Sequence, residues 1–197
     1  MRKITQIWIE DPNPPSPQIK TWMESIINSK DPEDTYTLIS TNNYFPLNPS
    51  VSWIDVNIIV SDLKSNYKSI DKMWGALRSE NKSDLIRYYF AQKAENSQMY
   101  YIDCDVEFKS WPEVKYLDNP YFAKIGNASV NNHVFNVNGK YGYMMELLKK
   151  VIALFEQSYA ATGYVAYAAA YVALNNQFRA RRCHLIPDGH FIHHQDA

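Results

Sequence analysis

The spacing of apolar residues changes repeatedly along this chain, and each change predicts a different secondary-structure element. Alternation among β-forming residues predicts a strand over residues 3–10 and another over residues 36–40. Four prolines within residues 11–17 predict an extended loop, because proline fixes φ and lacks an N–H donor. Apolar residues then recur three and four apart, which predicts a helix over residues 19–29.

The same reading continues to the end of the chain. Residues 51–66 fit a strand or a helix, and the pattern leaves both open. Ser83 is the predicted N-cap of a helix that ends near Ala94, and a strand over residues 99–102 follows. The other predicted elements are a helix over 67–78, strands over 121–125 and 133–138, helices over 141–159 and 164–175, and a hairpin or two short strands over 183–186 and 191–194. Because strands and helices are interleaved, the sequence predicts one α/β domain over residues 1–197.

Composition excludes some classes of partner. The formal net charge is −1, so the chain has no basic footprint for binding a nucleic-acid backbone. No apolar stretch reaches the ~20 residues that a membrane helix needs, and the N-terminus lacks a signal-peptide pattern. Two cysteines, Cys104 and Cys183, suggest reduced thiols. We therefore expect a soluble, intracellular and cytoplasmic protein without a membrane span.

Residues 100–106, Tyr-Tyr-Ile-Asp-Cys-Asp-Val, carry the strongest chemical signal. An apolar run delivers Asp103 and Asp105 where a buried strand should meet solvent. Strand alternation would place the two carboxylates on the same side. Two anionic groups held so close favour a cation between them, and Mg²⁺ or Mn²⁺ bound by carboxylates and substrate phosphates is the usual one.

Other candidate residues have ordinary structural explanations as well. Asp84 and Arg87 lie three apart on a predicted helix, where they would grip hydroxyl groups or form a surface ion pair. Trp8, at even spacing from Gln6 on the first strand, would stack on a nucleobase or pack in the core. His193 and His194 would contact a metal or phosphate, or lie in a solvated tail.

The order of these motifs resembles that of a known family. Gln-Ile-Trp-Ile at residues 6–9 precedes a proline loop, Lys-Ser-Asp-Leu-Ile-Arg-Tyr follows at 82–88, and Tyr-Ile-Asp-Cys-Asp-Val-Glu at 101–107. The pattern resembles the DXD-containing, sugar-binding glycosyltransferases of family 32, and more distantly the catalytic domains of the large clostridial glucosylating toxins. The resemblance implies a GT-A fold, a single α/β domain with a mostly parallel central sheet flanked by helices.

The resemblance also implies roles for individual residues. It implies that Asp84 and Arg87 grip the donor sugar, while Asp103 and Asp105 reach Mn²⁺ or Mg²⁺ and the diphosphate. Trp8 would pack on uracil with Gln6 beside it, and His194 would approach the metal or diphosphate. Residues of about 1–110 would bind the donor, and residues of about 111–197 would form the acceptor side and a closing segment.

The function implied is that of a metal-dependent, retaining hexosyltransferase. It would move a hexose from a nucleotide sugar to a hydroxyl of a glycan or protein acceptor. A UDP-sugar such as UDP-glucose is favoured as the donor over a GDP-sugar. The chain departs from the family at Asn96, Ser97 and Gln98, where members usually carry Gly-Gly, and it is shorter than most members. The acceptor side is where the shorter length would matter.

Two alternatives belong to other classes. Residues 102–106 also fit the first motif of haloacid-dehalogenase-like phosphatases, with Asp103 as nucleophile and Asp105 as acid/base. That motif normally opens the chain, and no later Asp-Asp pair completes the metal site. The second alternative is a non-catalytic module that binds a nucleotide sugar without turnover.

Overall fold

The computed structural model describes residues 1–9, 13–93, 98–113, 121–125, 129–138, 148–150, 152–153, 184–186 and 189–194. Within the helix predicted over residues 141–159, residues 148–150 and 152–153 are helical, and the rest of that prediction lies outside the described residues. The helix predicted over 164–175 lies wholly outside them, as do Asn96 and Ser97. Among the described helices, none has the length and apolar character needed to cross a membrane.

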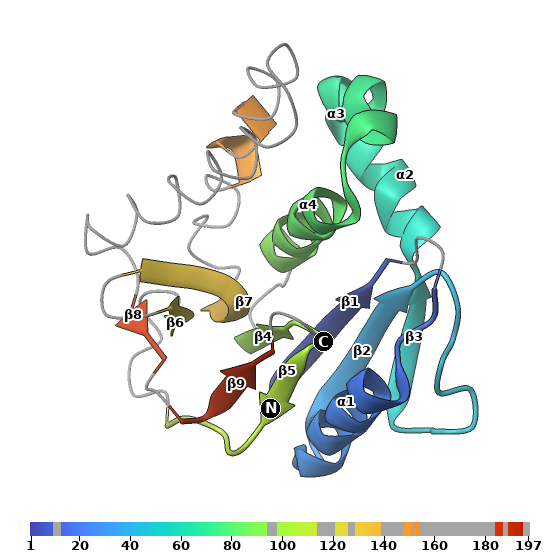
Figure 1. Cartoon of the computed structure of the whole chain (residues 1–197). Coiled ribbons are helices and arrows are strands. Elements are labelled where there is room, and N and C mark those ends of the chain that lie inside the picture. Colours follow the sequence, from blue (N-terminus) through green and yellow to red (C-terminus); the bar gives the residue numbers. More distant parts are fainter. Residues whose placement is uncertain are drawn as a thin grey trace.

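A seven-stranded sheet lies at the centre of the fold, in the order β3-β2-β1-β4-β7-β6-β8 (Figure 1). Its strands are β1 (Arg2–Trp8), β2 (Thr35–Ser40), β3 (Val51–Asp55), β4 (Gln98–Ile102), β6 (Tyr121–Ile125), β7 (Ser129–Asn138) and β8 (His184–Leu185). The first four strands of the chain run parallel, β7 is antiparallel to β4 and β6, and β8 is parallel to β6. The predicted mostly parallel sheet is confirmed, and such sheets bind ligands beyond the carboxyl ends of their strands.

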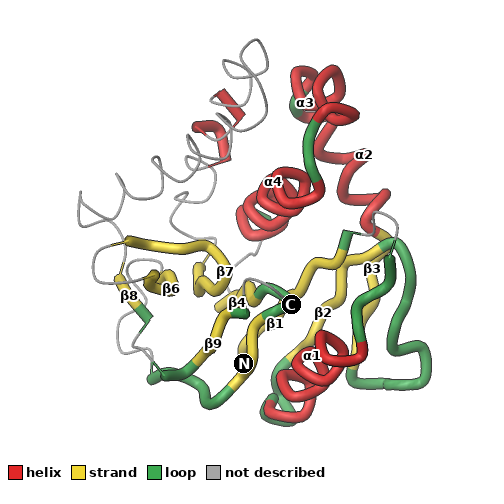
Figure 2. The backbone as a smooth tube through the Cα atoms, viewed as in Figure 1, coloured by secondary structure: helices red, strands yellow, loops and turns green. Residues whose placement is uncertain are grey.

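Helices pack on both faces of this sheet (Figure 2). They are α1 (Pro17–Ser29), α2 (Val56–Asn66), α3 (Lys68–Met73), the 3₁₀ turn η1 (Trp74–Ala76) and α4 (Ser79–Gln92). One buried cluster joins Ile7 of β1 to α2, α3 and α4, while another joins Ile4 to α1. Ile4 and Ile7 point to opposite faces because strand side chains alternate, so each cluster covers one face.

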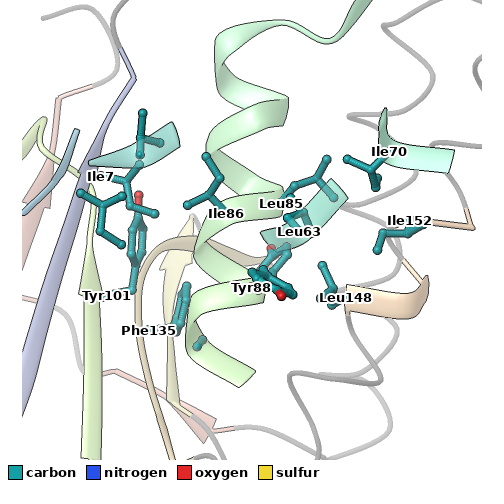
Figure 3. Packing of buried hydrophobic residues seen from close by; sticks show 14 of the residues in the cluster. Ile7, Leu63, Ile70, Leu85, Ile86, Tyr88, Tyr101, Phe135, Leu148 and Ile152 are labelled. Carbon is teal, nitrogen blue, oxygen red and sulfur yellow. The ribbon is translucent and has the colours of Figure 1, made fainter. Parts of the chain in front are cut away.

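The buried cluster that contains Ile7 and residues of α2, α3 and α4 is the larger of the two, and it fixes α4 against the sheet. Figure 3 shows Ile86 of α4 toward Ile7 and Tyr101 of the sheet, with Leu85 beside Leu63 of α2. All five side chains are at most 5% exposed. Full burial of each such side chain contributes roughly 1.5–3 kcal/mol. The position of α4 relative to β4 is therefore set by the core, and this packing places the polar residues of α4 near the end of β4.

Local chemistry explains where the first helices begin. Ser16 caps α1, accepting a hydrogen bond from the Ile19 amide at 3.3 Å, and Pro17 occupies the first turn, where its missing N–H costs nothing. Residues 51–66, which fitted a strand or a helix, contain one of each, β3 followed by α2. Asp55 is the last residue of β3, and its side chain caps α2 by accepting a hydrogen bond from the Asn57 amide at 2.9 Å.

The prediction that Ser83 begins the next helix is wrong. The helix α4 begins one turn earlier, at Ser79, and the Lys82 amide already donates to the Arg78 carbonyl at 3.0 Å. The Ser83 hydroxyl instead accepts a hydrogen bond from Arg87 Nη2 at 3.1 Å. A serine in the first turns of a helix can serve either purpose, and its sequence position does not distinguish them.

A second, two-stranded sheet pairs β5 (Val106–Phe108) with β9 (Phe191–His193) in antiparallel orientation. Of the two predicted arrangements at the C-terminal end, two separate short strands is the one observed, since β8 pairs with β6 and β9 with β5. The C-terminal strand β9 thereby pairs with the residues that directly follow Asp105, although the paired residues are 83 to 87 positions apart in sequence.

Candidate functional site

Asp103, Cys104 and Asp105 form a turn at the carboxyl end of β4. The Asp103 amide donates to the His133 carbonyl of β7 at 2.7 Å, and the Val106 amide donates to the Asp103 carbonyl at 3.3 Å. The buried thiol of Cys104 lies 3.4 Å from the Ile7 carbonyl of β1, and this contact fixes the middle residue of the turn against the sheet.

The expected reason for the convergence of the two carboxylates was strand alternation, and this reason is wrong. The strand stops at Ile102, and the turn brings the two aspartates together instead. Their side chains stay partly exposed, Asp103 at 21% and Asp105 at 30%, while Cys104 is buried. The turn therefore holds two partly buried acidic groups next to a fixed apolar residue.

Asp84 and Arg87 of α4 join this turn. The Arg87 guanidinium lies 3.5 Å from Asp84 Oδ1 through Nε and 3.1 Å from Asp103 Oδ1 through Nη2. It also lies over the Tyr101 ring, 4.5 Å from the ring centroid, and the Tyr101 hydroxyl donates to Asp103. Asp84 and Arg87 are almost fully buried, so they do not form the exposed surface ion pair that was the other possibility for this spacing.

Burial and charge shift the pKa values of this group in opposite directions. Burial raises the pKa of Asp103 to about 6, and the neighbouring Asp105 adds to the rise while Arg87 opposes it. Burial alone would lower the pKa of Arg87, but Asp103, Tyr101 and Asp84 outweigh it and the pKa is raised. The site thus concentrates negative charge around one permanently charged guanidinium.

His193 of β9 completes the site from the far end of the chain. Its Nε2 lies 3.3 Å from Asp105 Oδ2, and this contact raises the pKa of His193 against the opposing effect of burial. Among the described residues, Asp103, Asp105 and His193 each offer a ligand atom within 4.8 Å of the others. The Asp105 Oδ1 atom is buried and accepts no hydrogen bond from any described residue. One imidazole and two carboxylates, one of which has an unsatisfied buried oxygen, fit a divalent cation.

His133 of β7 lies behind His193. The two rings stack with centroids 4.4 Å apart and an interplanar angle of 5°. Burial and the adjacent His193 lower the pKa of His133 to about 3, so its ring is neutral at physiological pH.

The other predicted site residues lie around this centre with different contacts. Gln6 is fully buried, and its amide links the Asp103 carbonyl (3.2 Å) to the Tyr36 hydroxyl (2.6 Å). Trp8 is half-buried at the carboxyl end of β1, and its Nε1 donates to the Asn13 carbonyl at 3.3 Å. The His194 side chain has other contacts, with Nε2 3.3 Å from Glu107 Oε2 and its ring stacked on Trp22.

The structure therefore brings Asp84, Arg87, Asp103 and Asp105 together and adds His193 in place of its neighbour His194. Sequence reasoning weighed His193 but had no signal to choose between adjacent histidines. It missed Tyr101 and His133 as site residues. Tyr101 lies two positions before Asp103 at the end of β4, and this closeness in sequence was a usable signal, whereas nothing near His133 in sequence links it to the site.

No family model and no curated protein matches the chain in sequence. Solved structures do match it in fold. GlyE, a glycosyltransferase of Streptococcus pneumoniae TIGR4, has a TM-score of 0.60 at 14% identity, covering 95% of this chain and 45% of its own. Mouse xyloside xylosyltransferase 1 has a TM-score of 0.58 at 10% identity, covering 94% and 85%. The galactosyltransferase LgtC, solved with donor and acceptor sugar analogs, has a TM-score of 0.53 at 12% identity, covering 86% and 70%.

The fold is therefore the GT-A fold of glycosyltransferases, a mixed α/β architecture with a mostly parallel sheet flanked by helices. This chain spans less than half the length of GlyE. The acidic turn lies at the carboxyl end of β4, within the region where open α/β sheets bind their ligands.

Proposed function

We propose that this chain is a metal-dependent, retaining glycosyltransferase. It would move a hexose from a nucleoside diphosphate sugar, with a UDP-sugar favoured, to a hydroxyl group of a glycan or protein. The observation that carries the proposal is the meeting of Asp84, Arg87, Asp103, Asp105 and His193 at the carboxyl end of a GT-A sheet. These residues come from three separate parts of the chain, and no single stretch of sequence would bring them together.

Asp84 and Arg87 are the proposed sugar-binding groups. A carboxylate acceptor and a planar fork of donors lie side by side on α4 and are held by a buried ion pair. Sugar hydroxyls both donate and accept, so they suit this pair. Holding the hexose in one orientation fixes the anomeric carbon relative to the acceptor, which is a positioning contribution to the rate.

Asp103, Asp105 and His193 are the proposed ligands of Mn²⁺ or Mg²⁺. When bound, the ion would supply positive charge against the leaving diphosphate. Retention would follow from attack on the face that the diphosphate leaves, with a phosphate oxygen taking the proton of the acceptor hydroxyl. The chain's own part is to hold the donor and exclude other orientations.

Other parts of the proposal rest on sequence resemblance. Trp8 would stack on the uracil, and Gln6 would support the site by holding the Asp103 carbonyl. Residues of about 1–110 would bind the donor, and those of about 111–197 would form the acceptor side, with His193 and His194 in its closing segment. Membership in family 32 and a cytoplasmic location are proposed on the motif order and on the buried free thiol of Cys104.

Donor turnover tests the proposal. Hydrolysis or transfer from UDP-glucose, other UDP-hexoses and GDP-mannose is measured with Mn²⁺ and again with excess chelator. We expect turnover that chelator abolishes and that Asp105→Ala lowers by roughly 100-fold, because one metal ligand and its charge are lost. The matched control is Asp62→Asn, which removes an exposed carboxylate paired with Lys93 far from the turn. Unchanged turnover in Asp105→Ala would remove the metal role.

The alternatives predict different results in the same experiment. A phosphatase would hydrolyse a simple aryl phosphate and lose that activity in Asp103→Asn, but the fold does not favour it, and Asp103 is engaged by Arg87 and Tyr101. A non-catalytic module would bind nucleotide sugars tightly without turning over any donor.

A further inference from the structure

The strand β9 is too short to be held by backbone pairing alone. It is three residues long and pairs only with β5 in a two-stranded sheet among the described residues. Such an isolated ribbon is marginally stable in water. Side chains on either side of β9 must therefore supply much of the force that keeps His193 beside Asp105.

His133 contacts the site in two independent ways. Its backbone carbonyl accepts from the Asp103 amide at 2.7 Å, and its ring stacks on His193 at 4.4 Å with the planes 5° apart. A substitution at His133 removes the ring but keeps the backbone contact, so the two effects can be separated. The stacked face leaves Nε2 of His193 directed at Asp105, 3.3 Å away.

Trp22 of α1 holds the next residue in the same manner. Its indole stacks on His194, with ring centroids 4.3 Å apart and planes 11° apart. The His194 amide donates to the Asp105 carbonyl at 3.1 Å, so this stack also fixes the backbone beside Asp105. Trp22 is only 9% exposed and belongs to the α1 cluster, which gives it a rigid base.

We propose that His133 and Trp22 are positioning residues that hold β9 from two sides, so that His193 is preorganised as a metal ligand. The inference rests on the proposed function for the metal, and adds that the ligand's orientation depends on two flat rings outside the three proposed ligand residues. Removing a group that orients a metal ligand typically lowers metal affinity by about 10- to 100-fold. Preorganisation has this effect because an unrestrained imidazole must lose its rotational freedom on binding.

The test measures the Mn²⁺ dissociation constant by isothermal titration calorimetry. Electron spin echo envelope modulation then detects whether an imidazole nitrogen is bound directly to Mn²⁺. We expect His133→Ala and Trp22→Leu to raise the dissociation constant about 10-fold. His133→Phe and Trp22→Phe keep a flat ring and should stay within about 3-fold of the unmodified protein. At saturating Mn²⁺, the nitrogen signal should weaken in His133→Ala, which a general loss of stability would not cause.

His190→Ala is the matched control, because it removes an imidazole beside β9 that bonds Ser110 and stacks on no ring among the described residues. An equal loss of affinity in this control, or unchanged affinity in both His133→Ala and Trp22→Leu, would overturn the inference. His193→Ala distinguishes failure of the proposed metal site from failure of the proposed positioning role. If the unmodified protein binds no Mn²⁺, or His193→Ala leaves the nitrogen signal intact, then the proposed metal site itself is wrong.

Discussion

Arg87 determines the charge balance of the candidate site. Its guanidinium pairs with Asp84 and Asp103. It also lies over the face of the Tyr101 ring and donates a hydrogen bond to the Ser83 hydroxyl. A lysine at the same position would keep the charge but lose the planar fork that addresses several acceptors together. The function of this residue therefore depends on geometry as well as on charge.

Arg87→Lys is expected to lower kcat/KM for donor turnover by about 10- to 150-fold, because hydrogen bonds to charged groups contribute about 1.5–3 kcal/mol. Steady-state kinetics with the best nucleotide-sugar donor measures the change. Arg78→Lys, the same substitution just before α4, is the control and should leave kcat/KM unchanged. A loss under 2-fold in Arg87→Lys would contradict the role given to the fork.

Asp34 is a buried acid with a structural role. It accepts hydrogen bonds from the Arg2 amide at 2.6 Å and from Arg2 Nε at 2.7 Å. Burial alone would raise the pKa of Asp34, but these bonds and the charge of Arg2 outweigh burial and lower it. The folded-state pKa is thus below the unfolded value of about 3.9, so the ionised group stabilises the fold above that pH.

Asp34→Asn should lower the free energy of unfolding by about 1–3 kcal/mol at pH 7. The difference between the two proteins should shrink as the pH falls below about 4, because Asp34 of the unmodified protein then takes up a proton, first in the unfolded chain and at lower pH in the folded one. Urea unfolding across this pH range measures it. Asp31→Asn removes a more exposed partner of Arg2 and should cost less than about 1 kcal/mol at any pH. A pH-independent difference for Asp34→Asn would exclude the proposed linkage.

At the scale of elements, periodicity identified the strands and helices that carry their own signal. The helix α1 has apolar residues on one face and a serine–proline start, β1 shows the alternation of a strand, and β4 is a short, mostly apolar run. The start of α4 could not be predicted, because Ser83 has cap chemistry but its hydroxyl is used by a side chain. The pairing of β9 with β5 joins residues 83 to 87 positions apart, and a local sequence pattern cannot predict such a contact.

The two serines at predicted helix starts provide a test of this distinction. Ser16→Ala removes an observed cap and should cost about 0.5–2 kcal/mol of folding stability. Ser83→Ala removes no cap, and its only expected loss is the hydrogen bond from Arg87, so in an Arg87→Met background it should change the stability by less than about 0.5 kcal/mol. Chemical denaturation of both variants measures the difference. Equal losses would show that Ser83 supports the helix after all.

At the scale of the whole molecule, the site is assembled from α4, the turn after β4 and the C-terminal strand β9. The sequence supplied four of its members, since Asp84, Arg87, Asp103 and Asp105 lie in recognisable motifs. It did not supply His133 or the choice of His193, because these are fixed by packing across β7 and β5. The candidate site therefore exists only in the folded chain, and a ligand that binds there should raise the stability of the whole fold.

A ligand that binds only the folded state raises the free energy of unfolding by about 2.7 kcal/mol at 100 times its dissociation constant. For a chain of this size, 1 kcal/mol shifts Tm by about 2–4 °C, so Mn²⁺ with UDP-glucose should raise Tm by about 5–10 °C. Excess chelator should remove most of the shift, because the diphosphate would lose its counter-charge. Differential scanning fluorimetry with UDP-glucose, UDP-galactose and GDP-mannose measures the effect and ranks the donors. Asp105→Ala should lose the shift, whereas Asp62→Asn should keep it. A Tm that stays unchanged with every nucleotide sugar in the presence of Mn²⁺ would contradict a donor site in this fold.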